Sequence, residues 1–460
     1  MKPLLIACVS QAMLRSLFFG LSLGCVMSAM STVARGNSPM AIPTLDDVLG
    51  GENAVALALL HSRADGKSSK VLVPRLAQLA QESVEAICKP MLAGRFEMRV
   101  GAGEVVLRDL QAHDRAALMT ALGAAELGDL RAYFTALAES GVTLSERIGV
   151  LEILGVHGNR EDMTLLLHWA AGYKFQGRIK RGLREAYGTA VALILERDPK
   201  AISLARRIYS DLPLALKPAL IRALGRTESM ESLATLTGFL GRNSQMDALI
   251  LRELAVLGGQ LKHPLDVKAQ WRIAKTLHSP ARAIRQQCIE ACKSMETTQA
   301  VPALIALMSS EDAFESEQAL KALEFITGQR LSRDEKEWTD WLEGAHIWWE
   351  SEAQDLIHQV RTGTPAEVNQ ALVKLSRERY FRHRLVTPVA VGLENEEESI
   401  VRVACAALGY MGSPLGVEPL LDRLARASKQ PIHQAALQAL LQITGQNHGA
   451  NPEAWHKAGW

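Results

Sequence analysis

From about residue 141 to the C-terminus, apolar residues recur at steps of three and four, and Gly, Pro, Asn or Asp separate the apolar pieces. This spacing predicts short amphipathic helices that tight turns join into pairs. An apolar segment ending in Gly or in small residues marks the first helix of each pair, as in "LIRALG" ending at Gly225 and "ELAVLG" ending at Gly258. These two glycines lie 33 residues apart. Repetition at this period is typical of a helical solenoid, so we expect the pairs to stack around a long shared core.

Two blocks of the chain match at a constant offset of 117 residues. The phrase "ITGQRLSRDEKEW" (Ile326 to Trp338) returns as "ITGQNHGANPEAW" (Ile443 to Trp455). The same offset relates Arg285 to Arg402, Cys288 to Cys405, Pro302 to Pro419 and Ala319 to Ala436. A match of this length at one offset indicates an internal duplication, in which each copy holds two helical pairs followed by the ITGQ…W ending.

The ITGQ…W ending has a predicted structural role. We expect Gly328 and Gly445 to close a helix in the left-handed conformation that glycine adopts easily. Trp338 and Trp455 would then lie on the next helical turn and cover an apolar flank that the longer loop exposes. A ligand site at this motif is the alternative. We also expect residues at matching positions, Arg285 and Arg402 in particular, to have similar surroundings.

The duplicated blocks resemble HEAT repeats. The resemblance rests on small residues in the first helix, on a Pro near the start of the second (Pro302, Pro419), and on the opening pairs Ile284-Arg285 and Val401-Arg402. The ITGQ…W endings look like the form common in bacterial, planctomycete-like HEAT proteins. The resemblance covers about residues 141–460 and weakens between 344 and 398. It implies an all-α fold, an α-solenoid superhelix of HEAT-like helix pairs, and indicates little about function.

The region 35–140 is less regular than the rest. "FEMRVGAGEVVLRDL" (Phe96 to Leu110) alternates apolar and polar residues around Gly101-Ala102-Gly103 and predicts a β-hairpin near 96–110. Segments with helical periodicity flank the predicted hairpin on both sides. We therefore expect a divergent N-terminal helical cap over 35–140 with one small β-hairpin insert, ahead of a solenoid over 141–460, since the terminal repeats of a solenoid must cover its end.

The N-terminal segment 1–34 is typical of a secretory signal peptide. Lys2 and Arg15 precede the apolar run Leu17 to Met30, and "TVA" (Thr32 to Ala34) offers a cleavage site. Met13 is an alternative start to Met1. This predicts a periplasmic or extracellular protein. The alternatives are a membrane anchor through the uncleaved segment and lipidation at Cys25, where Ser22 replaces the aliphatic residue that the lipidation motif prefers. Nothing after residue 34 is long and apolar enough to span a membrane.

Composition and motifs exclude several function classes. The formal net charge of +1 argues against a general nucleic-acid binder. There is no C-x-x-C pair and no paired His-Glu motif, and "GKS" at Gly66 to Ser68 lacks the first glycine of a phosphate loop. Cys288 and Cys292 stand four apart in a helical pattern, too far apart for a disulfide, and are expected to be small core residues. We therefore predict no cofactor, no metal site and no catalytic residue.

Two basic segments admit two interpretations. One places Lys174, Arg178 and Arg181 along one helical stripe, and the other, "RERYFRHRL", interleaves arginines with Tyr380 and Phe381. Mixed basic and aromatic residues can bind single-stranded nucleic acid. A solvated surface is the interpretation that the balanced charge favours, and we predict no nucleic-acid partner.

The segment "EWTDWLEGAHIWWE" concentrates four Trp residues. Trp338 and Trp341 share a helical face, whereas Trp348 and Trp349 point about 100° apart and cannot both face inward. An exposed Trp can anchor a partner or support a sugar ring. Trp341, Trp348 and Trp349 are therefore the candidate partner or ligand contacts.

These observations together predict a non-catalytic scaffold that binds a protein partner on the concave surface of the solenoid, outside the cytoplasm. One alternative is an enzyme on a HEAT scaffold, of the kind that lyase-like and glycosylase-like members of the wider family illustrate. Another is carbohydrate or cell-envelope binding through the Trp338 to Trp349 cluster. The sequence leaves the partner's identity and the oligomeric state open.

Overall fold

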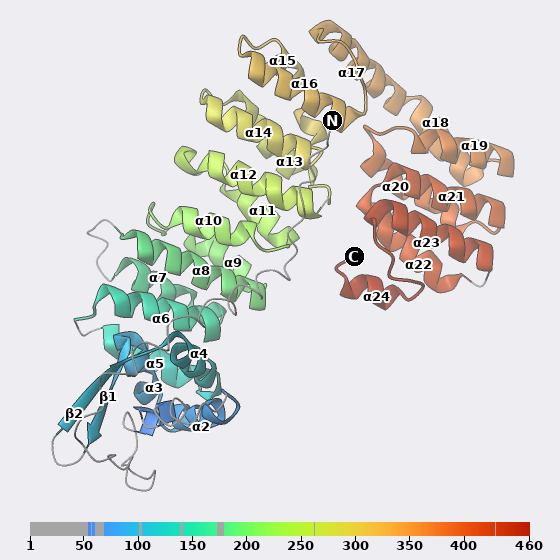
Figure 1. The fold of residues 1–460 in the computed structure, drawn as a ribbon. Helices are drawn as coiled ribbons and strands as arrows, with labels where there is room; N and C mark the ends of the chain where they lie inside the picture. Colours follow the sequence, from blue (N-terminus) through green and yellow to red (C-terminus); the bar gives the residue numbers. More distant parts are fainter. Residues whose placement is uncertain are drawn as a thin grey trace, which may run out of the picture.

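The computed structural model describes residues 54–56, 58–59, 69–100, 104–138, 141–172, 179–261, 263–427 and 429–460. The expected signal peptide (Met1 to Ala34), "GKS" and the basic residues Lys174 and Arg178 lie outside the described residues. Figure 1 shows a long stack of helices that rises from the N-terminal hairpin, turns at its far end and descends as a second, shorter stack. The described chain is thus an α-solenoid, as the helical periodicity predicts, and its two arms face each other across a bend.

The N-terminal part contains α2 (Ser69–Glu82), α3 (Val84–Ala93), α4 (Ala112–Ala121) and α5 (Leu127–Ala138). The first arm contains α6 (Leu144–His157), α7 (Met163–Ala171), α8 (Arg181–Arg197), α9 (Ala201–Ile208), α10 (Lys217–Gly225), α11 (Met230–Phe239), α12 (Ser244–Leu261), α13 (Val267–Lys275), α14 (Arg282–Ser294), α15 (Val301–Met308) and α16 (Ala313–Thr327). After α17 (Glu335–Glu350), the second arm contains α18 (Glu352–Thr362), α19 (Pro365–Ser376), α20 (Arg382–Ala390), α21 (Glu398–Met411), α22 (Val417–Arg426), α23 (Gln430–Thr444) and α24 (Pro452–Lys457).

The expected β-hairpin is present at the N-terminal end. Strands β1 (Arg95–Val100) and β2 (Glu104–Asp109) pair antiparallel, with Arg95 opposite Asp109 and Val100 opposite Glu104. Phe96 is buried at its base, against the helices that precede α6. The hairpin projects from the end of the solenoid (Figure 1).

The arms are built from two layers of helices. Helices two apart in the sequence pack side by side, so α6, α8, α10, α12, α14 and α16 form one layer of the first arm, and α19, α21 and α23 form the same layer of the second. The partners of these helices form the other layer, which includes α9, α11 and α13 and, in the second arm, α20 and α22. This second-helix layer lies on the side of each arm that faces the other arm (Figure 1). We call that side the inner face and the first-helix side the outer face.

The glycines that end the recurring apolar segments are needed where first helices meet. A Cβ atom on Gly155 of α6 would lie 2.7 Å from the Cα of Ala190 in α8. A Cβ atom on Gly409 of α21 would lie 3.0 Å from the Cα of Ala439 in α23. A Cβ atom at Gly155 would therefore push the two helices apart, and one at Gly409 would make a tighter contact than most Cβ atoms make. The recurring Leu-Gly pairs in the sequence therefore mark places where the backbones of neighbouring first helices approach closely.

Both copies of the ITGQ…W ending have the same structure. Gly328 and Gly445 close α16 and α23 with φ of 75° and 73°. Trp338 and Trp455 are fully buried. The Trp338 indole N–H donates to the Ser332 carbonyl at 3.0 Å, and the Trp455 indole N–H donates to the Gly449 carbonyl, which is the matching residue, at 2.8 Å. The motif therefore has the structural role expected of it, since neither indole is available to a ligand.

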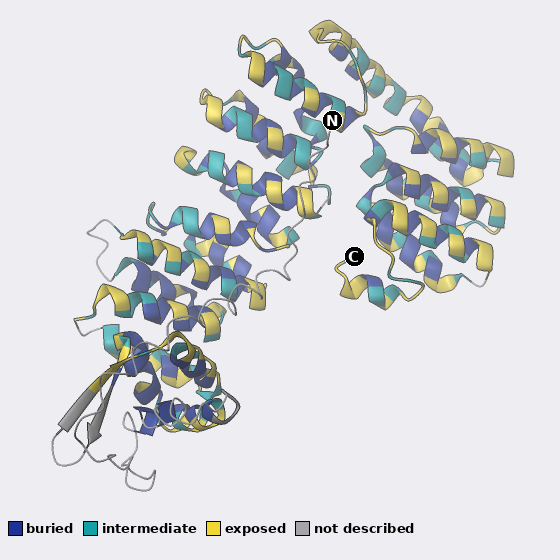
Figure 2. Cartoon of the chain, in the orientation of Figure 1, coloured by how far each residue is buried: buried dark blue, intermediate teal, exposed yellow. Residues whose placement is uncertain are grey.

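The apolar interior is divided into two cores. The first runs from Val55 to Leu342 and the second from Leu356 to Trp455. The helix between them, α17, buries only Trp338 and Leu342, and both lie in its first half. Figure 2 shows α17 mostly exposed or partly buried, in contrast to the dark interior of the arms. The continuous core that the repeat pattern predicts is thus interrupted at the bend.

Because the cores are separate, removing Trp455 should weaken the second arm alone. We expect Trp455→Ala to destabilise that arm by about 3–5 kcal/mol, since the change empties a large buried site and leaves the Gly449 carbonyl without its donor. Hydrogen exchange should accelerate for amides of α21–α24 and stay unchanged for α8–α12. Trp271→Ala, at a position 56% exposed, is the control and should change stability by less than about 0.5 kcal/mol. Equal loss of protection in both arms would contradict the division.

Candidate interaction surfaces

The Trp-rich helix and the basic–aromatic segment meet each other at the bend. The ring of Trp341 lies 5.4 Å from that of Tyr380, and the rings of Trp348 and Trp349 lie 5.8 Å and 4.9 Å from that of Phe381. The Arg384 guanidinium stacks on Trp349 at 3.8 Å from the ring centre. Two segments that the sequence suggested as separate sites therefore pack on one another.

An ion cluster closes the same bend from the inner side. Glu296, in the turn after α14, pairs with Arg382 of α20, and its carboxylate also lies 3.8 Å from Arg379 and 3.8 Å from His383. Glu296 has a φ of 47°, the only positive φ of a described residue other than glycine. His383 in turn hydrogen-bonds the Ser413 hydroxyl at 2.8 Å through Nδ1. This cluster ties a turn of the first arm to the start of α20 in the second.

The charges of the cluster favour an ionised Glu296. Burial by itself would raise the pKa of its carboxyl, but the hydrogen bond with His383 and the positive charges of Arg382 and Arg379 outweigh burial and lower it. Burial is also the main reason why the pKa of Arg382 is lowered, with the Glu296 charge acting in the opposite direction. Each charge therefore favours the ionised form of the other at this partly buried place.

The Trp-rich helix and the basic–aromatic segment, which the sequence suggested as candidate sites, thus share a structural role: they pack against each other at the bend. Trp341, Trp348 and Trp349 are half-buried, and contact of these three rings with an external ligand stays a prediction. The expected stripe of the other basic segment stays a prediction, because Lys174 and Arg178 lie outside the described residues and only Arg181, the first residue of α8, is described.

An exposed Trp lies elsewhere, in α13. Trp271 is 56% exposed and Val267, one turn before it, is 57% exposed. The buried residues of this helix are Ile273 and Ala274. A helical wheel places Trp271 about 200° from Ile273, so the sequence did carry a signal for its exposure. The sequence analysis missed it by concentrating on the segment where Trp residues cluster.

Two grooves lie on the outer face, between first helices. The larger, of about 930 Å³, follows α21 between α19 and α23 and includes Arg377, Arg402 and Tyr410. The smaller, of about 570 Å³, lies between α8 and α10. Four arginines surround it, together with Glu185: Arg181, Arg184, Arg222 and Arg226. The sequence analysis did not identify either groove, because each is formed by helices that another helix separates in the chain.

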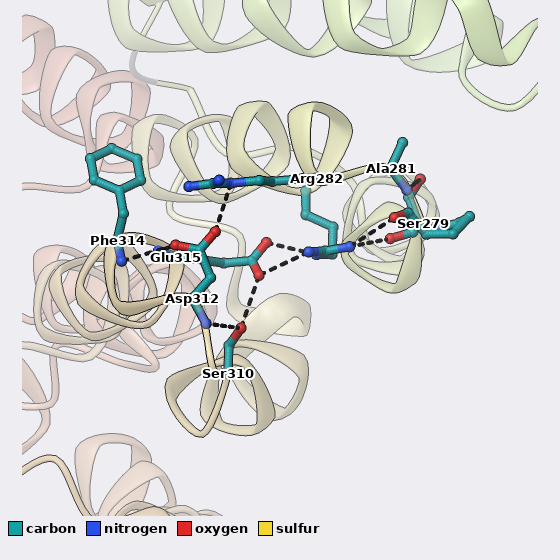
Figure 3. A network of polar contacts seen from close by, with 9 residues as sticks. Ser279, Ala281, Arg282, Ser310, Asp312, Phe314 and Glu315 are labelled. Carbon is teal, nitrogen blue, oxygen red and sulfur yellow. Dashed lines mark hydrogen bonds and ion pairs between the residues drawn. The ribbon is translucent and has the colours of Figure 1, made fainter.

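The matching residues Arg285 and Arg402 have unlike surroundings, contrary to expectation. Arg285 donates to both oxygens of the buried Glu315, at 2.6 and 3.0 Å, and to two backbone carbonyls before α14. Beside it, Arg282 pairs with Asp312 at 2.6 Å (Figure 3). In the second copy Ile432 stands where Glu315 would be, and Arg402 is exposed with no ion pair among the described residues. The duplicated backbone therefore carries different surface chemistry in its two copies.

The described residues contain few reactive groups. Cys88, Cys288, Cys292 and Cys405 are free and buried, and burial raises the pKa of Cys88 to about 12 and of Cys405 to about 11. The Cys88 and Cys405 thiols therefore remain protonated at neutral pH. Within the described ranges, no three His, Cys, Asp or Glu side chains gather as metal ligands would. In the same part of the chain, no helix has both the length and the apolar surface that crossing a bilayer requires.

The lowered pKa of Glu296 predicts how the bend responds to acid. A carboxyl whose folded pKa lies below its ordinary value of about 4.5 stabilises the fold fully above that value, and the contribution is lost as pH falls through the folded pKa. Glu296→Gln should therefore lower the melting temperature at pH 7, at a cost of about 2–3 kcal/mol, because it leaves Arg382 without its counter-charge. The difference from the unmodified protein should shrink as pH falls below about 4.5 and through the lower pKa of the folded state. A difference that is constant with pH would show that the charge of Glu296 is not involved.

The duplicated arginines provide a matched pair of substitutions. Arg285→Ala leaves the carboxylate of Glu315, which is 1% exposed, without its cation. We expect a loss of about 2–3 kcal/mol in chemical denaturation. Arg402→Ala, at the equivalent exposed position, should change stability by less than about 0.5 kcal/mol. Similar losses for the two variants would show that the ion pair contributes nothing specific.

Known proteins are only distantly similar to this chain. No protein-family model matches the chain, and no curated protein matches it significantly. Among solved structures it is similar to an engineered protein, with a TM-score of 0.30 and 14% identity over 87% of this chain and 97% of that one. It is also similar to importin beta, with a TM-score of 0.28 and 12% identity over 86% of this chain and 56% of that one. At these values neither similarity carries an argument, and the helix stacking described above is what identifies the chain as an α-solenoid.

Proposed function

We propose that this protein is a non-catalytic scaffold that binds a protein partner on its inner face. The observation that carries the proposal is the exposure of Val267 and Trp271 on α13, in the second-helix layer of an extended solenoid. Solenoids of this kind present long surfaces on which other proteins bind. A large aromatic side chain left in water next to a second apolar residue is the type of anchor that dominates protein interfaces.

The surroundings of Trp271 suggest the chemistry of the partner. Lys268, Arg272 and Lys275 are exposed on the same helix, and none of them has an ion pair among the described residues. Arg272 points its Nη1 toward the Thr237 carbonyl of α11, at 3.5 Å. An apolar anchor with cations along one side suits a partner segment in which carboxylates stand beside apolar side chains.

Export from the cytoplasm is part of the proposal. It is supported by the basic, apolar and small-residue regions between Met1 and Ala34, which the structure does not describe. Mass spectrometry of the mature N-terminus from fractionated cells tests it. A terminus just after Ala34 supports export with cleavage, an acylated Cys25 supports the lipidated alternative, and an intact Met1 or Met13 in the soluble cytoplasmic fraction contradicts export.

The inner-face proposal predicts a strong effect of one side chain. The full mature chain and its Trp271→Ala variant would be immobilised and used to enrich proteins from cell-envelope extract, with quantification by mass spectrometry. We expect the main partner to fall at least tenfold with Trp271→Ala, in line with the loss of an interface anchor. Phe314→Ala is the matched control, since Phe314 is 55% exposed on α16 in the outer layer, and it should leave enrichment unchanged. Equal enrichment on Trp271→Ala, or no specifically enriched protein, would contradict the proposal.

A further inference from the structure

The groove along α21 differs from the rest of the outer face. Its floor is formed by small side chains such as Val403 and Ala406, between the helices α19 and α23. Val373 is 41% exposed on one side, and Tyr410 is 71% exposed at the end. About 930 Å³ of space therefore lies above a mostly apolar surface that water covers in the free protein.

The charges around this groove are all of one sign. Arg377 and Arg402 line it, and the other lining residues are uncharged. Neither arginine has an ion pair among the described residues. The nearest acidic residues lie at the start of α21, and one of them, Glu398, forms an ion pair with Lys429 at 3.4 Å instead. Two guanidinium groups that have no ion pair among the described residues thus lie beside the apolar groove.

In the first copy of the duplication, the arginines at this surface have internal partners. There Arg282 pairs with Asp312, and Arg285 pairs with Glu315 (Figure 3). Lys293 also pairs with Glu290 at 3.6 Å. The second copy replaces these partners: Ser399 stands for Arg282, Lys429 for Asp312, Ile432 for Glu315 and Tyr410 for Lys293. On the same helical framework, internal ion pairs have given way to one unpaired arginine, an exposed aromatic ring and an open groove.

We propose that the groove of α19, α21 and α23 binds a segment of another protein in which a carboxylate stands beside apolar side chains. The carboxylate pairs with Arg402, which has no internal carboxylate partner because the buried Ile432 stands at the position of Glu315, and the apolar side chains cover Val403, Ala406 and Tyr410. A planar guanidinium binds a carboxylate through two parallel hydrogen bonds, which fixes the position of the segment in the groove. This surface lies opposite the inner face and does not depend on the function proposed for Trp271.

A peptide library tests the proposal without a known partner. A phage-displayed library of random 16-residue peptides would be selected on the full mature chain, with counter-selection on the Arg377→Glu/Arg402→Glu double variant. Selected peptides would be synthesised, labelled and titrated by fluorescence polarisation. Circular dichroism would establish that the exposed substitutions leave the fold intact.

The expected result is enrichment of peptides that combine Asp or Glu with Leu, Phe or similar residues. Their affinity should fall at least tenfold on Arg402→Glu and on Tyr410→Ala. It should be unchanged on Arg206→Glu, an equal charge reversal on α9, and unchanged on Trp271→Ala, which separates this surface from the inner face. Failure to select such peptides, or binding that survives Arg402→Glu, overturns the proposal. So does a dimer of the unmodified chain that Arg402→Glu dissociates, since the occupant would then be a second copy.

Discussion

The structure depends on one constraint: a pair of short helices cannot bury its apolar side alone and must share it with the next pair. Each pair of this chain supplies buried Leu, Ile, Val and Ala residues on the sides that neighbouring pairs cover. The helices can approach closely only where side chains are absent, as at Gly155 against Ala190 and at Gly409 against Ala439. Stacking in register therefore sets both the spacing of the sequence signals and the extended shape, and it leaves two long faces open to other molecules.

At the bend this apolar stacking is replaced by a different set of interactions. The core of the first arm ends at Leu342 and that of the second begins at Leu356. Between them, ring contacts of Trp341 and Trp349 with the segment before α20, together with the Glu296 cluster, hold the arms. Apolar contacts tolerate sliding, whereas an ion cluster and tilted ring pairs are satisfied in few orientations. We infer that the joint contributes mainly to the relative orientation of the arms, and less to the stability of either.

The sequence predicted those parts of the fold that arise from nearby residues. Helical periodicity, the hairpin around Gly101 and the helix-closing Gly328 are each set by short stretches of chain, and all three appear in the structure as expected or, for the hairpin, one residue earlier. The role of the Trp cluster was not predictable in the same way. Trp348 and Trp349 pack on Phe381, which α18 and α19 separate from them in the chain, and no local pattern identifies that partner. The unlike surroundings of Arg285 and Arg402 were predictable, because the aligned copies already place Ile432 at the position of Glu315.

The two copies of the duplication also distinguish the features that the helical framework requires from the surface residues that can differ. Helix closure by Gly328 and Gly445, and the two indole hydrogen bonds, recur because they fix how the chain leaves one helix and enters the next. The position of Arg285 and Arg402 is not fixed in this way: Arg285 pairs with the buried Glu315, whereas Arg402 is exposed to water and Ile432 stands where that carboxylate would be. A surface under no structural requirement is free to acquire a binding role. In the second copy, where Ile432 stands at the position of Glu315, the unpaired Arg402 and the exposed Tyr410 both line one groove, and this combination is why we assign a binding role to it.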